Sequence, residues 1–267
     1  MTSTSTENGQ PAGEPGQRLR ILSYNVQVGI STSRFRDYFT HGWKHVLPFS
    51  GRQRNLHQVA RLMRGFDIVG LQEVDAGSLR SGHVNQTEYL ARVAGFPFWR
   101  HRTNRDLGYI ARHSLGLASR REPREIIRTR LPGAVPGRGM LMARFGEGDD
   151  SLLVAVVHLA LGRGSRQRQM EAIAEYTRQH RHAIVMGDFN CLPDSPEMQH
   201  LQTSAGLVLP EEELYTYPSW RPSRHIDHIL VTPGIQVEKA SALNVPYSDH
   251  LPLALEVTLP ASVSLFS

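Results

Sequence analysis

Several apolar runs in this sequence end at, or follow, a polar residue that a buried strand normally avoids. These residues are carboxylates, amides and imidazoles: Asn25, Glu73, His158, Asp188, Asn190, Asp227, Asp249 and His250. Carboxylate and amide oxygens suit a hard cation such as Mg²⁺, and a nearby histidine can transfer a proton or bind a phosphate oxygen. If the strand ends share one edge of the fold, they form a single site of this chemistry.

The run AIVMGDFN (183–190) raises the question of what compensates the charge of Asp188. A buried carboxylate costs several kcal/mol unless a positive charge or hydrogen-bond donors lie opposite it. Taken alone, a strand-end Asn is usually a turn residue, and a lone His is usually a structural one. Few structural needs would produce the whole set, so we interpret it as functional.

Short apolar runs bounded by Gly, Pro or Asp predict the strands of a covered sheet. They span residues 20–26, 66–74, 115–119, 139–145, 151–159, 182–189, 225–232 and 251–259. Helical spacing predicts three helices, at 52–65, at 85–95 with a capping box from Asn85 to Glu88, and at 165–180 opening on Ser165. The mixture of hairpin-like and helical connections predicts an α/β sandwich with mixed sheets and helices outside.

Length and composition favour one large domain of ordinary soluble character, since the chain has 267 residues and is 40% hydrophobic. We expect a disordered N-terminal tail over 1–18, a domain over 19–260 and a C-terminal tail over 261–267. The sole cysteine, Cys191, excludes an internal disulfide and a cysteine-based zinc cluster. The sequence shows neither a signal peptide nor a membrane span, so we expect a cytoplasmic protein.

The formal charge of +5 comes almost entirely from arginine, with a concentration of arginines between residues 100 and 130. Arginine binds phosphate bidentately, so this charge fits phosphorylated substrates, nucleic acid or an anionic membrane. A preference for arginine codons or a solvated surface explains it equally well. The aromatic and basic stretch at 31–50 suits a substrate rim or a membrane-touching loop, although an irregular, partly buried connection is the favoured interpretation.

Six motifs follow one another along the chain: SYNVQVG, LQEVD, VVHLALG, GDFN, HIDHILVT and YSDHLPL. In this order they resemble the signature of the endonuclease/exonuclease/phosphatase family. That family comprises metal-dependent phosphodiesterases, including DNase I-like nucleases, neutral sphingomyelinases and inositol polyphosphate 5-phosphatases. The resemblance runs from about Arg20 to Leu259. It implies a four-layer α/β/β/α sandwich of two packed mixed sheets, with the site at one end.

The resemblance also implies a metal site for Mg²⁺ (or Mn²⁺). Glu73 is expected to be the main ligand, and Asn25 is expected to lie close to the same ion and to the phosphate. Asp249 is expected to complete the network of metal or water. A site with one strong carboxylate ligand suits Mg²⁺, because this ion keeps several of its waters and binds substrate phosphate as well.

The same resemblance assigns the catalytic roles to five residues. Asp188 is expected to orient or deprotonate the attacking water, and Asn190 to donate a hydrogen bond to the phosphate. His158 is expected to stabilise a phosphoryl oxygen. Asp227 should pair with His250 and fix its tautomer and charge, so that an imidazolium lies where negative charge builds up.

Three departures from the family pattern concern the metal and the HIDH motif. Gln27 stands where many nucleases of the family have a carboxylate, which makes a second metal contact there doubtful. His228 stands where an aromatic residue is usual, and we exclude it from the catalytic set. His225 stands where arginine is frequent, and the neighbouring Arg224 is the candidate substrate-binding residue in its place.

Three functions stay open. The first is a phosphodiesterase acting on a lipid head group or another small phosphodiester, which the short chain, the 31–50 stretch and the segment YTYPSW favour. This interpretation adds Trp220 to the substrate-binding residues and implies possible peripheral membrane contact, without an obligate protein partner. The second is a DNA endonuclease or exonuclease, supported by the arginines. The third is a non-catalytic binding module, which the intact motifs disfavour.

Overall fold

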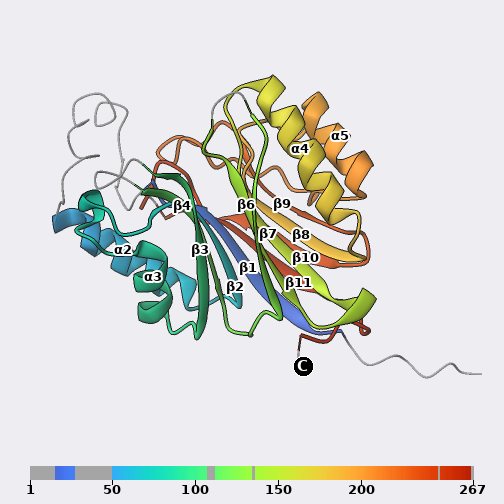
Figure 1. The fold of residues 1–267 in the computed structure, drawn as a ribbon, viewed down its shortest axis with the longest axis horizontal. Helices are drawn as coiled ribbons and strands as arrows, with labels where there is room; N and C mark the ends of the chain where they lie inside the picture. Colours follow the sequence, from blue (N-terminus) through green and yellow to red (C-terminus); the bar gives the residue numbers. More distant parts are fainter. Residues whose placement is uncertain (1–15, 28–49, 107–111, 134–135, 246, 266–267) are drawn as a thin grey trace, which may run out of the picture.

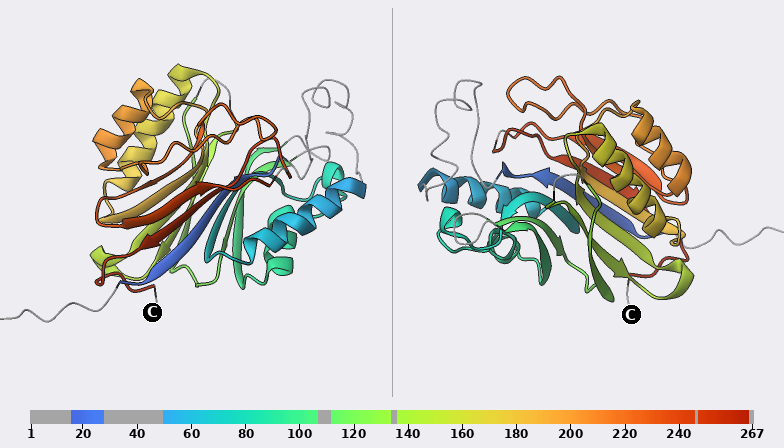
Figure 2. Two further views of the ribbon diagram at one scale, coloured as in Figure 1. Left: turned by 180° about the vertical axis from the view of Figure 1, so that it is seen from behind. Right: turned by 45° about the horizontal axis from the view of Figure 1, so that its top comes forward.

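Two β-sheets pack face to face, and a pair of helices covers each outer face (Figures 1 and 2). The computed structural model describes residues 16–27, 50–106, 112–133, 136–245 and 247–265. The expected disordered tail, up to residue 15, and the 31–49 stretch lie outside these residues. The four-layer α/β/β/α sandwich inferred from the motifs is therefore confirmed.

The first sheet has the strand order β10-β11-β1-β2-β4-β3. Its strands are β1 (Arg18–Asn25), β2 (Ile68–Asp75), β3 (Phe98–Asp106), β4 (Arg112–Ser119), β10 (Gln236–Ala242) and β11 (Leu253–Thr258). The second sheet has the order β5-β6-β7-β8-β9. Its strands are β5 (Glu125–Arg130), β6 (Gly139–Phe145), β7 (Leu152–His158), β8 (His182–Asp188) and β9 (Asp227–Val231). Both sheets are mixed, because β1 with β2 and β7 with β8 are parallel pairs among antiparallel ones.

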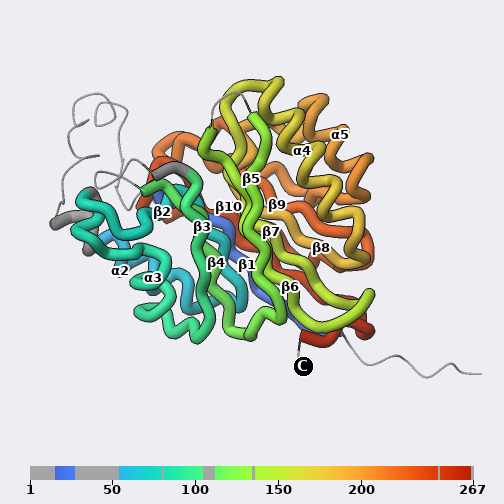
Figure 3. Tube along the Cα trace, in the orientation of Figure 1, coloured from blue at the N-terminus to red at the C-terminus, as the bar shows by residue number. Residues whose placement is uncertain are grey.

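Helices α2 (Ser50–Met63) and α3 (Gln86–Ala94) lie on the first sheet, and α4 (Arg163–Thr177) and α5 (Pro196–Ala205) lie on the second (Figure 3). Asn85 caps α3 as expected, because its side chain accepts a hydrogen bond from the backbone N–H of Glu88. The expected start of α4 at Ser165 is wrong. The helix begins at Arg163, and Gly162 is its N-cap.

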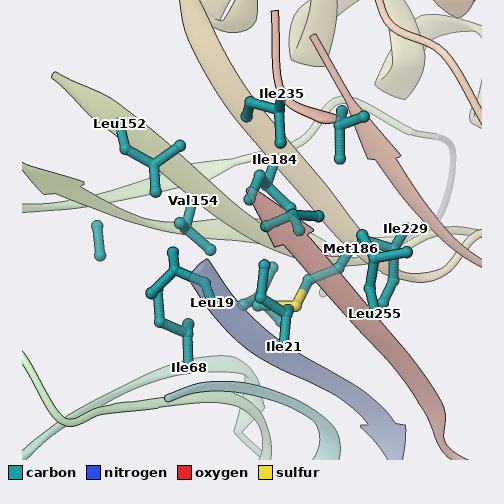
Figure 4. Packing of buried hydrophobic residues seen from close by; sticks show 14 of the residues in the cluster. Leu19, Ile21, Ile68, Leu152, Val154, Ile184, Met186, Ile229, Ile235 and Leu255 are labelled. Carbon is teal, nitrogen blue, oxygen red and sulfur yellow. The ribbon is translucent and has the colours of Figure 1, made fainter. Parts of the chain in front are cut away.

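Three buried clusters separate the four layers. The central cluster lies between the two sheets and includes Ile21, Val154, Ile184 and Met186 (Figure 4). The sheets approach closely at Gly70, where an added Cβ would lie 2.8 Å from Met186 Cε. The other two clusters fill the space between each sheet and its own helices. Strands β7 and β8 are buried along their whole length, because a sheet covers one face and helices cover the other.

Strands β3, β5 and β10 have no counterpart among the expected strands. Each is an edge strand of its sheet, and their sequences FWRHRTNRD, EIIRTR and QVEKASA carry many charges. Edge strands are half exposed and commonly carry charge, which prevents uncontrolled pairing but removes the apolar pattern that predicts a strand. Helix α5 was also not predicted, although Ser195 caps its first turn and Pro196 stands at its start.

The packed part of the chain extends beyond the expected boundary at residue 260. Val263 and Leu265 are buried in the central cluster, so the described part of the expected C-terminal tail is folded against the sheets. At the other end, strand β1 already begins at Arg18. Among the described helices, none has both the length and the apolar character needed to cross a membrane.

A buried ion pair joins α4 to α5 and supports the loop after β7. Arg166 donates from Nε and Nη2 to Glu197 Oε1, at 3.1 and 2.7 Å, and from Nη1 to the carbonyl oxygens of Ala160 and Leu161. Both side chains are buried. The pair therefore fixes the chain that follows His158.

Replacing Glu197 with glutamine is expected to lower the free energy of unfolding by about 3 kcal/mol, because it leaves the Arg166 charge buried without a counter-charge. Urea denaturation followed by circular dichroism measures this change. Glu171→Gln, at an exposed position of α4, is the matched control and should leave stability nearly unchanged. Equal stabilities of the two variants would contradict a structural role for the pair.

Candidate active site

The motif residues of the first sheet lie at one edge of the sandwich. Parallel pairing of β1 and β2 places Asn25 opposite Gln72, so Glu73 follows one residue further along the same edge. Antiparallel pairing of β1 and β11 places Ser23 opposite Leu253, which brings the loop before β11 to this edge. That loop carries His250.

The second sheet contributes its residues at the same edge. His158 at the end of β7 pairs in register with Asp188 at the end of β8, and Asp188 pairs on its other side with Asp227 at the start of β9. Across the sandwich, Asn25 Nδ2 donates to Asp188 Oδ2 at 3.2 Å. The convergence of the strand ends on one edge is therefore present in the fold.

Asp188 lies at the centre of this group and is almost fully buried. Its Oδ2 lies 3.4 Å from His158 Nε2 and 3.9 Å from His250 Nε2, in addition to the Asn25 amide. Its Oδ1 accepts a hydrogen bond from the backbone N–H of Asn190 at 3.0 Å. These imidazoles and N–H donors are the groups that compensate the carboxylate at the end of β8.

Burial, followed by the charges of Asp227 and Glu73, raises the pKa of Asp188 to about 7, although His250 and the Asn190 N–H act in the opposite direction. A carboxylate with a pKa near neutrality can accept a proton and release it again at physiological pH. The position of Asp188 therefore suits a general base.

His250 is held by Asp227, with Nδ1 of the imidazole 2.8 Å from Oδ2 of the carboxylate. Burial acts to lower the pKa of His250, but Asp227, Asp188 and Asp249 together raise it to about 10. The Asp227 carboxylate accepts a hydrogen bond from Nδ1–H, and the Nε2–H of the imidazolium lies on the side of Asp188. His250 thus places a positive charge and a hydrogen-bond donor in the centre of the site.

Two residues that the motifs did not reveal position this pair. Thr216 Oγ1 donates to Asp227 Oδ2 at 2.5 Å, and the ring of Tyr217 packs on the ring of His250 with 4.9 Å between centroids. Both belong to the YTYPSW segment at 215–220, which the sequence connected only with the choice of substrate. Hydrogen bonds from Ser219 to the backbone oxygens of the Ser248–Asp249 loop attach the segment to the site.

His158 bridges the two sides of the site, since its Nε2 lies 3.4 Å from Asp188 Oδ2 and 3.9 Å from Glu73 Oε1. Burial, and then the charges of Arg138, His250 and His113, hold the pKa of His158 well below its ordinary value. His158 is therefore neutral at pH 7. A neutral imidazole here can donate one hydrogen bond without adding charge.

The backbone is unusual at the residues that carry two of the functional side chains. Glu73 has φ = 56° and Asn190 has φ = 54°, in the left-handed region that residues other than glycine rarely adopt. The pairing of β2 with β4 also shifts between Leu71 and Val74, so that Glu73 lies in a β-bulge. Such bulges are common beside active sites, where they redirect a side chain.

The two expected substrate-binding residues belong to the segment that packs beside His250. Arg224 is exposed and pairs through its backbone with Tyr217, whereas Trp220 is half-buried. The contacts that the structure describes around Asp188 and His250 include neither side chain. Their assignment to substrate binding stays a prediction.

Two sets of residues could hold a metal ion. Asp188, Asp227 and His250 bring ligand atoms within 4.8 Å of one another. In this set, however, Nδ1 of His250 is already engaged by Asp227, which suits proton transfer better than coordination of a hard cation.

The donor set of Glu73, Asn25 and Asp249 fits Mg²⁺ better, because every donor is oxygen. Burial and then Glu73 raise the pKa of Asp249 to about 6, even though His250 and Ser248 lower it. Glu73 raises the pKa of Asp188 as well. Negative charge is thus concentrated around Glu73, and a cation there would relieve it.

A cavity of about 490 Å³ opens beside Glu73 and His158. Its remaining polar lining comes from loops and strand ends that the motifs did not cover: Asn104, His113, Ser114, Arg138 and Ser165. A cavity of this volume is in the range that accommodates a small ligand. The sequence held no signal for this group, because its members come from three separate connections.

The sequence profile of the Endonuclease/Exonuclease/phosphatase family matches residues 22–250. The chain belongs to the endonuclease/exonuclease/phosphatase family. Enzymes of this family hydrolyse phosphate esters with the help of a metal, and the buried group of acidic and histidine side chains lies where the family's motifs converge. No curated protein matches the chain by sequence.

Solved structures of the endonuclease/exonuclease/phosphatase family share the fold. A family protein from Bacteroides thetaiotaomicron is similar with a TM-score of 0.71 and 18% identity, over 92% of this chain and 99% of its own. The mannosyl-6-phosphatase of the same species gives 0.68 and 18%, over 90% and 100% of the two chains. The catalytic domain of human Nocturnin, solved with a bound sulfate anion, gives 0.64 and 17%, over 91% and 95%. At these identities the likeness establishes the fold alone.

Proposed function

We propose that this protein is a Mg²⁺- or Mn²⁺-dependent hydrolase of small phosphate esters, with small phosphodiesters as the first candidates. The observation that carries the proposal is the surrounding of Asp188: Asn25, His158 and His250 lie 3.2 to 3.9 Å from its Oδ2. This arrangement combines a base with donors for a phosphoryl group beside a cavity that can admit a small ester.

In the proposed mechanism, Asp188 takes a proton from a water molecule as the water oxygen attacks phosphorus. The phosphorus–oxygen bond of the ester breaks on the opposite side, the leaving oxygen takes a proton from solvent water, and Asp188 returns its proton to solvent. His250, kept protonated by Asp227, and neutral His158 donate hydrogen bonds to the phosphoryl oxygens as negative charge builds up on them. Preorganised donors of this kind are each worth about 3 kcal/mol of barrier.

Glu73, Asn25 and Asp249 would hold the metal ion, which when bound would neutralise phosphate charge and act as a Lewis acid. Glu73 and Asn25 would therefore play different roles at the metal site. Glu73 would supply the main negative charge, and Asn25 would keep its amide nitrogen on Asp188 while its oxygen, which accepts a hydrogen bond from the Gln27 N–H, would also bind the ion. This division matches the hydrogen bond that Asn25 Nδ2 donates to Asp188 Oδ2.

A small substrate is favoured over duplex DNA by the cavity and by the positions of Arg120 and Arg124. Arg120 and Arg124 lie at the opposite end of the strands from the site, where Arg120 Nε donates to the Phe66 carbonyl and Arg124 pairs with Glu147. These arginines therefore do not extend one groove from the active site. Sulfate in Nocturnin and sugar phosphate for the mannosyl-6-phosphatase are also small anions. Contact with a membrane stays a prediction, because the 31–49 stretch lies outside the described residues.

The test is hydrolysis of a panel of substrates in Mg²⁺ or Mn²⁺. The panel contains bis-p-nitrophenyl phosphate, p-nitrophenyl phosphate, mannose 6-phosphate, sphingomyelin vesicles and supercoiled plasmid. EDTA and the Asp188→Asn variant serve as controls. Metal-dependent cleavage of the small esters supports the proposal, whereas cleavage of plasmid alone identifies a nuclease. No cleavage of any member would favour a binding module.

Glu73→Gln is expected to raise the Mg²⁺ concentration for half-maximal hydrolysis by about tenfold or more, since even a supporting group at a metal site contributes that much. The substitution keeps the shape of the side chain and removes the charge that holds the ion. Metal titration of bis-p-nitrophenyl phosphate hydrolysis measures the effect, with the exposed Glu122→Gln as the matched control. An unchanged titration curve for Glu73→Gln would exclude Glu73 as the main ligand.

A further inference from the structure

We propose that the cavity beside Glu73 and His158 binds a second anionic group of the substrate, so that the preferred substrates are small phosphate esters with a further phosphate. This inference rests on the proposed function and names its substrate class. It depends on the wall of the cavity opposite the reacting centre. That wall is formed by the end of β3, the start of β4, the start of β6 and the start of α4.

The first observation is a buried arginine behind this wall. Arg102 on β3 is only 9% exposed, and its guanidinium lies against the backbone of Gly139 on β6, where any Cβ would collide with it. Burial and then the charge of Arg130 lower the pKa of Arg102. Among the described residues, no carboxylate pairs with its guanidinium. The wall thus contains a buried positive charge that no described acidic side chain neutralises.

The second observation is the orientation of the amide that lines the cavity. Asn104 Oδ1 accepts a hydrogen bond from Arg102 Nη1. Because the oxygen is engaged by the arginine, the NH₂ group of Asn104 is the part left to bind a ligand. Asn104 lines the cavity, so the Arg102–Asn104 pair presents N–H donors and partial positive charge to it.

The other groups that form this wall also carry positive charge or partial positive charge. Arg138 and His113 line the cavity, and both lower the pKa of His158 through their positive charge. Helix α4 starts at this wall, where its N-cap Gly162 has no side chain and lines the cavity, so the positive end of the helix dipole lies beside the same space. Among the described lining residues, Glu73 is the only acidic one, and it lies at the reacting end.

The cavity is also large enough for two phosphate groups on a small scaffold. Its volume of about 490 Å³ extends from Glu73 and His158 to Asn104 and Ser165. A monoester or diester without a second charge would place no anionic group against the Arg102–Asn104 pair. A second phosphate would form charge-assisted hydrogen bonds there, which are about twice as strong as neutral ones.

The test compares the binding of matched sugar phosphates by isothermal titration calorimetry in saturating Mg²⁺, with every protein carrying Asp188→Asn so that the ligands are not hydrolysed. The pairs are fructose 6-phosphate with fructose 1,6-bisphosphate, and glucose 1-phosphate with glucose 1,6-bisphosphate. In at least one pair, we expect the bisphosphate to bind the protein with an unaltered far wall about tenfold or more tightly, as one or two charge-assisted hydrogen bonds provide. Equal affinities within both pairs would overturn the proposal.

Asn104→Asp tests the far wall without changing its shape. The variant keeps an oxygen for Arg102 but replaces the NH₂ donor with a second oxygen, so the preference for the bisphosphate should fall about tenfold. Arg102→Gln should reduce the preference as well, and Arg100→Gln, at an exposed position of the same strand, should preserve it. A preference that persists in Asn104→Asp would refute the role of the pair.

Failure of this inference differs from failure of the proposed function, because binding is measured without turnover. Selective bisphosphate binding by a protein that hydrolyses no phosphate ester would support the anion site and contradict the hydrolase. Hydrolysis of bis-p-nitrophenyl phosphate with equal binding of the sugar phosphates would support the hydrolase and overturn the anion site.

Discussion

Replacing Asp188 with asparagine is expected to lower kcat/KM for bis-p-nitrophenyl phosphate by about 10²–10⁴-fold, the usual contribution of a general base. Asn and Asp have the same shape, so the hydrogen bond from the Asn190 N–H to the side-chain oxygen can persist. The amide cannot accept a proton from water at neutral pH. The variant therefore separates the chemistry of the carboxylate from its packing.

Steady-state kinetics at fixed Mg²⁺ measures this loss, and thermal unfolding checks that the fold is intact. Asp194→Asn is the matched control, because Asp194 is exposed in the loop that follows the same strand. Activity within a few-fold of wild type in Asp188→Asn would remove Asp188 from the mechanism. A loss of activity accompanied by a large loss of stability would indicate a structural role instead.

Replacing His250 with glutamine is the second change for which we expect a large effect, about 10²–10³-fold in kcat, as is usual when one preorganised donor to the developing charge is lost. Glutamine can donate a hydrogen bond but carries no positive charge. His200→Gln, at an exposed position, is the control. Its activity and its stability should equal those of the wild-type protein. A kcat for His250→Gln equal to that of wild type would show that the imidazolium is not needed.

The pH profile tests how Asp227 supports His250. Asp227, Asp188 and Asp249 overcome the effect of burial and raise the pKa of His250 to about 10, so the imidazolium form persists below that pH and is lost above it. Asp227→Asn removes one of these negative charges. The alkaline limb of the kcat profile should therefore move to lower pH, whereas an unmoved limb would show that His250 is not the titrating acid.

The motif residues and the fold could be predicted because they depend on residues that are close together in the sequence. The ends of buried strands such as β7 and β8 stand out, since a polar residue such as His158 or Asp188 interrupts a continuous apolar run. The helix start at Asn85 also depends on neighbouring residues alone. A pattern that depends only on near neighbours is visible without the structure.

The features that were missed depend on contacts between distant segments. Thr216 reaches Asp227, and Arg102 reaches Gly139, only after the two sheets have packed. The edge strands β3, β5 and β10 carry charge because one side of each is solvent-facing, so no apolar run marks them. The cavity wall was missed for both reasons. Asn104 lies on an edge strand without an apolar pattern, and it acts with residues that are distant in the sequence.

The bulge in β2 changes which side of the sheet each residue faces. Val69, Leu71 and Val74 all belong to the cluster under α2 and α3, although strict alternation would turn Val74 to the opposite side from Leu71. The extra residue between Leu71 and Val74 resets this alternation. Glu73 can then face His158 while Val74 returns to the helix-side core. One inserted residue thus lets Val74 pack in the core beneath the helices while the preceding residue, Glu73, points into the active site.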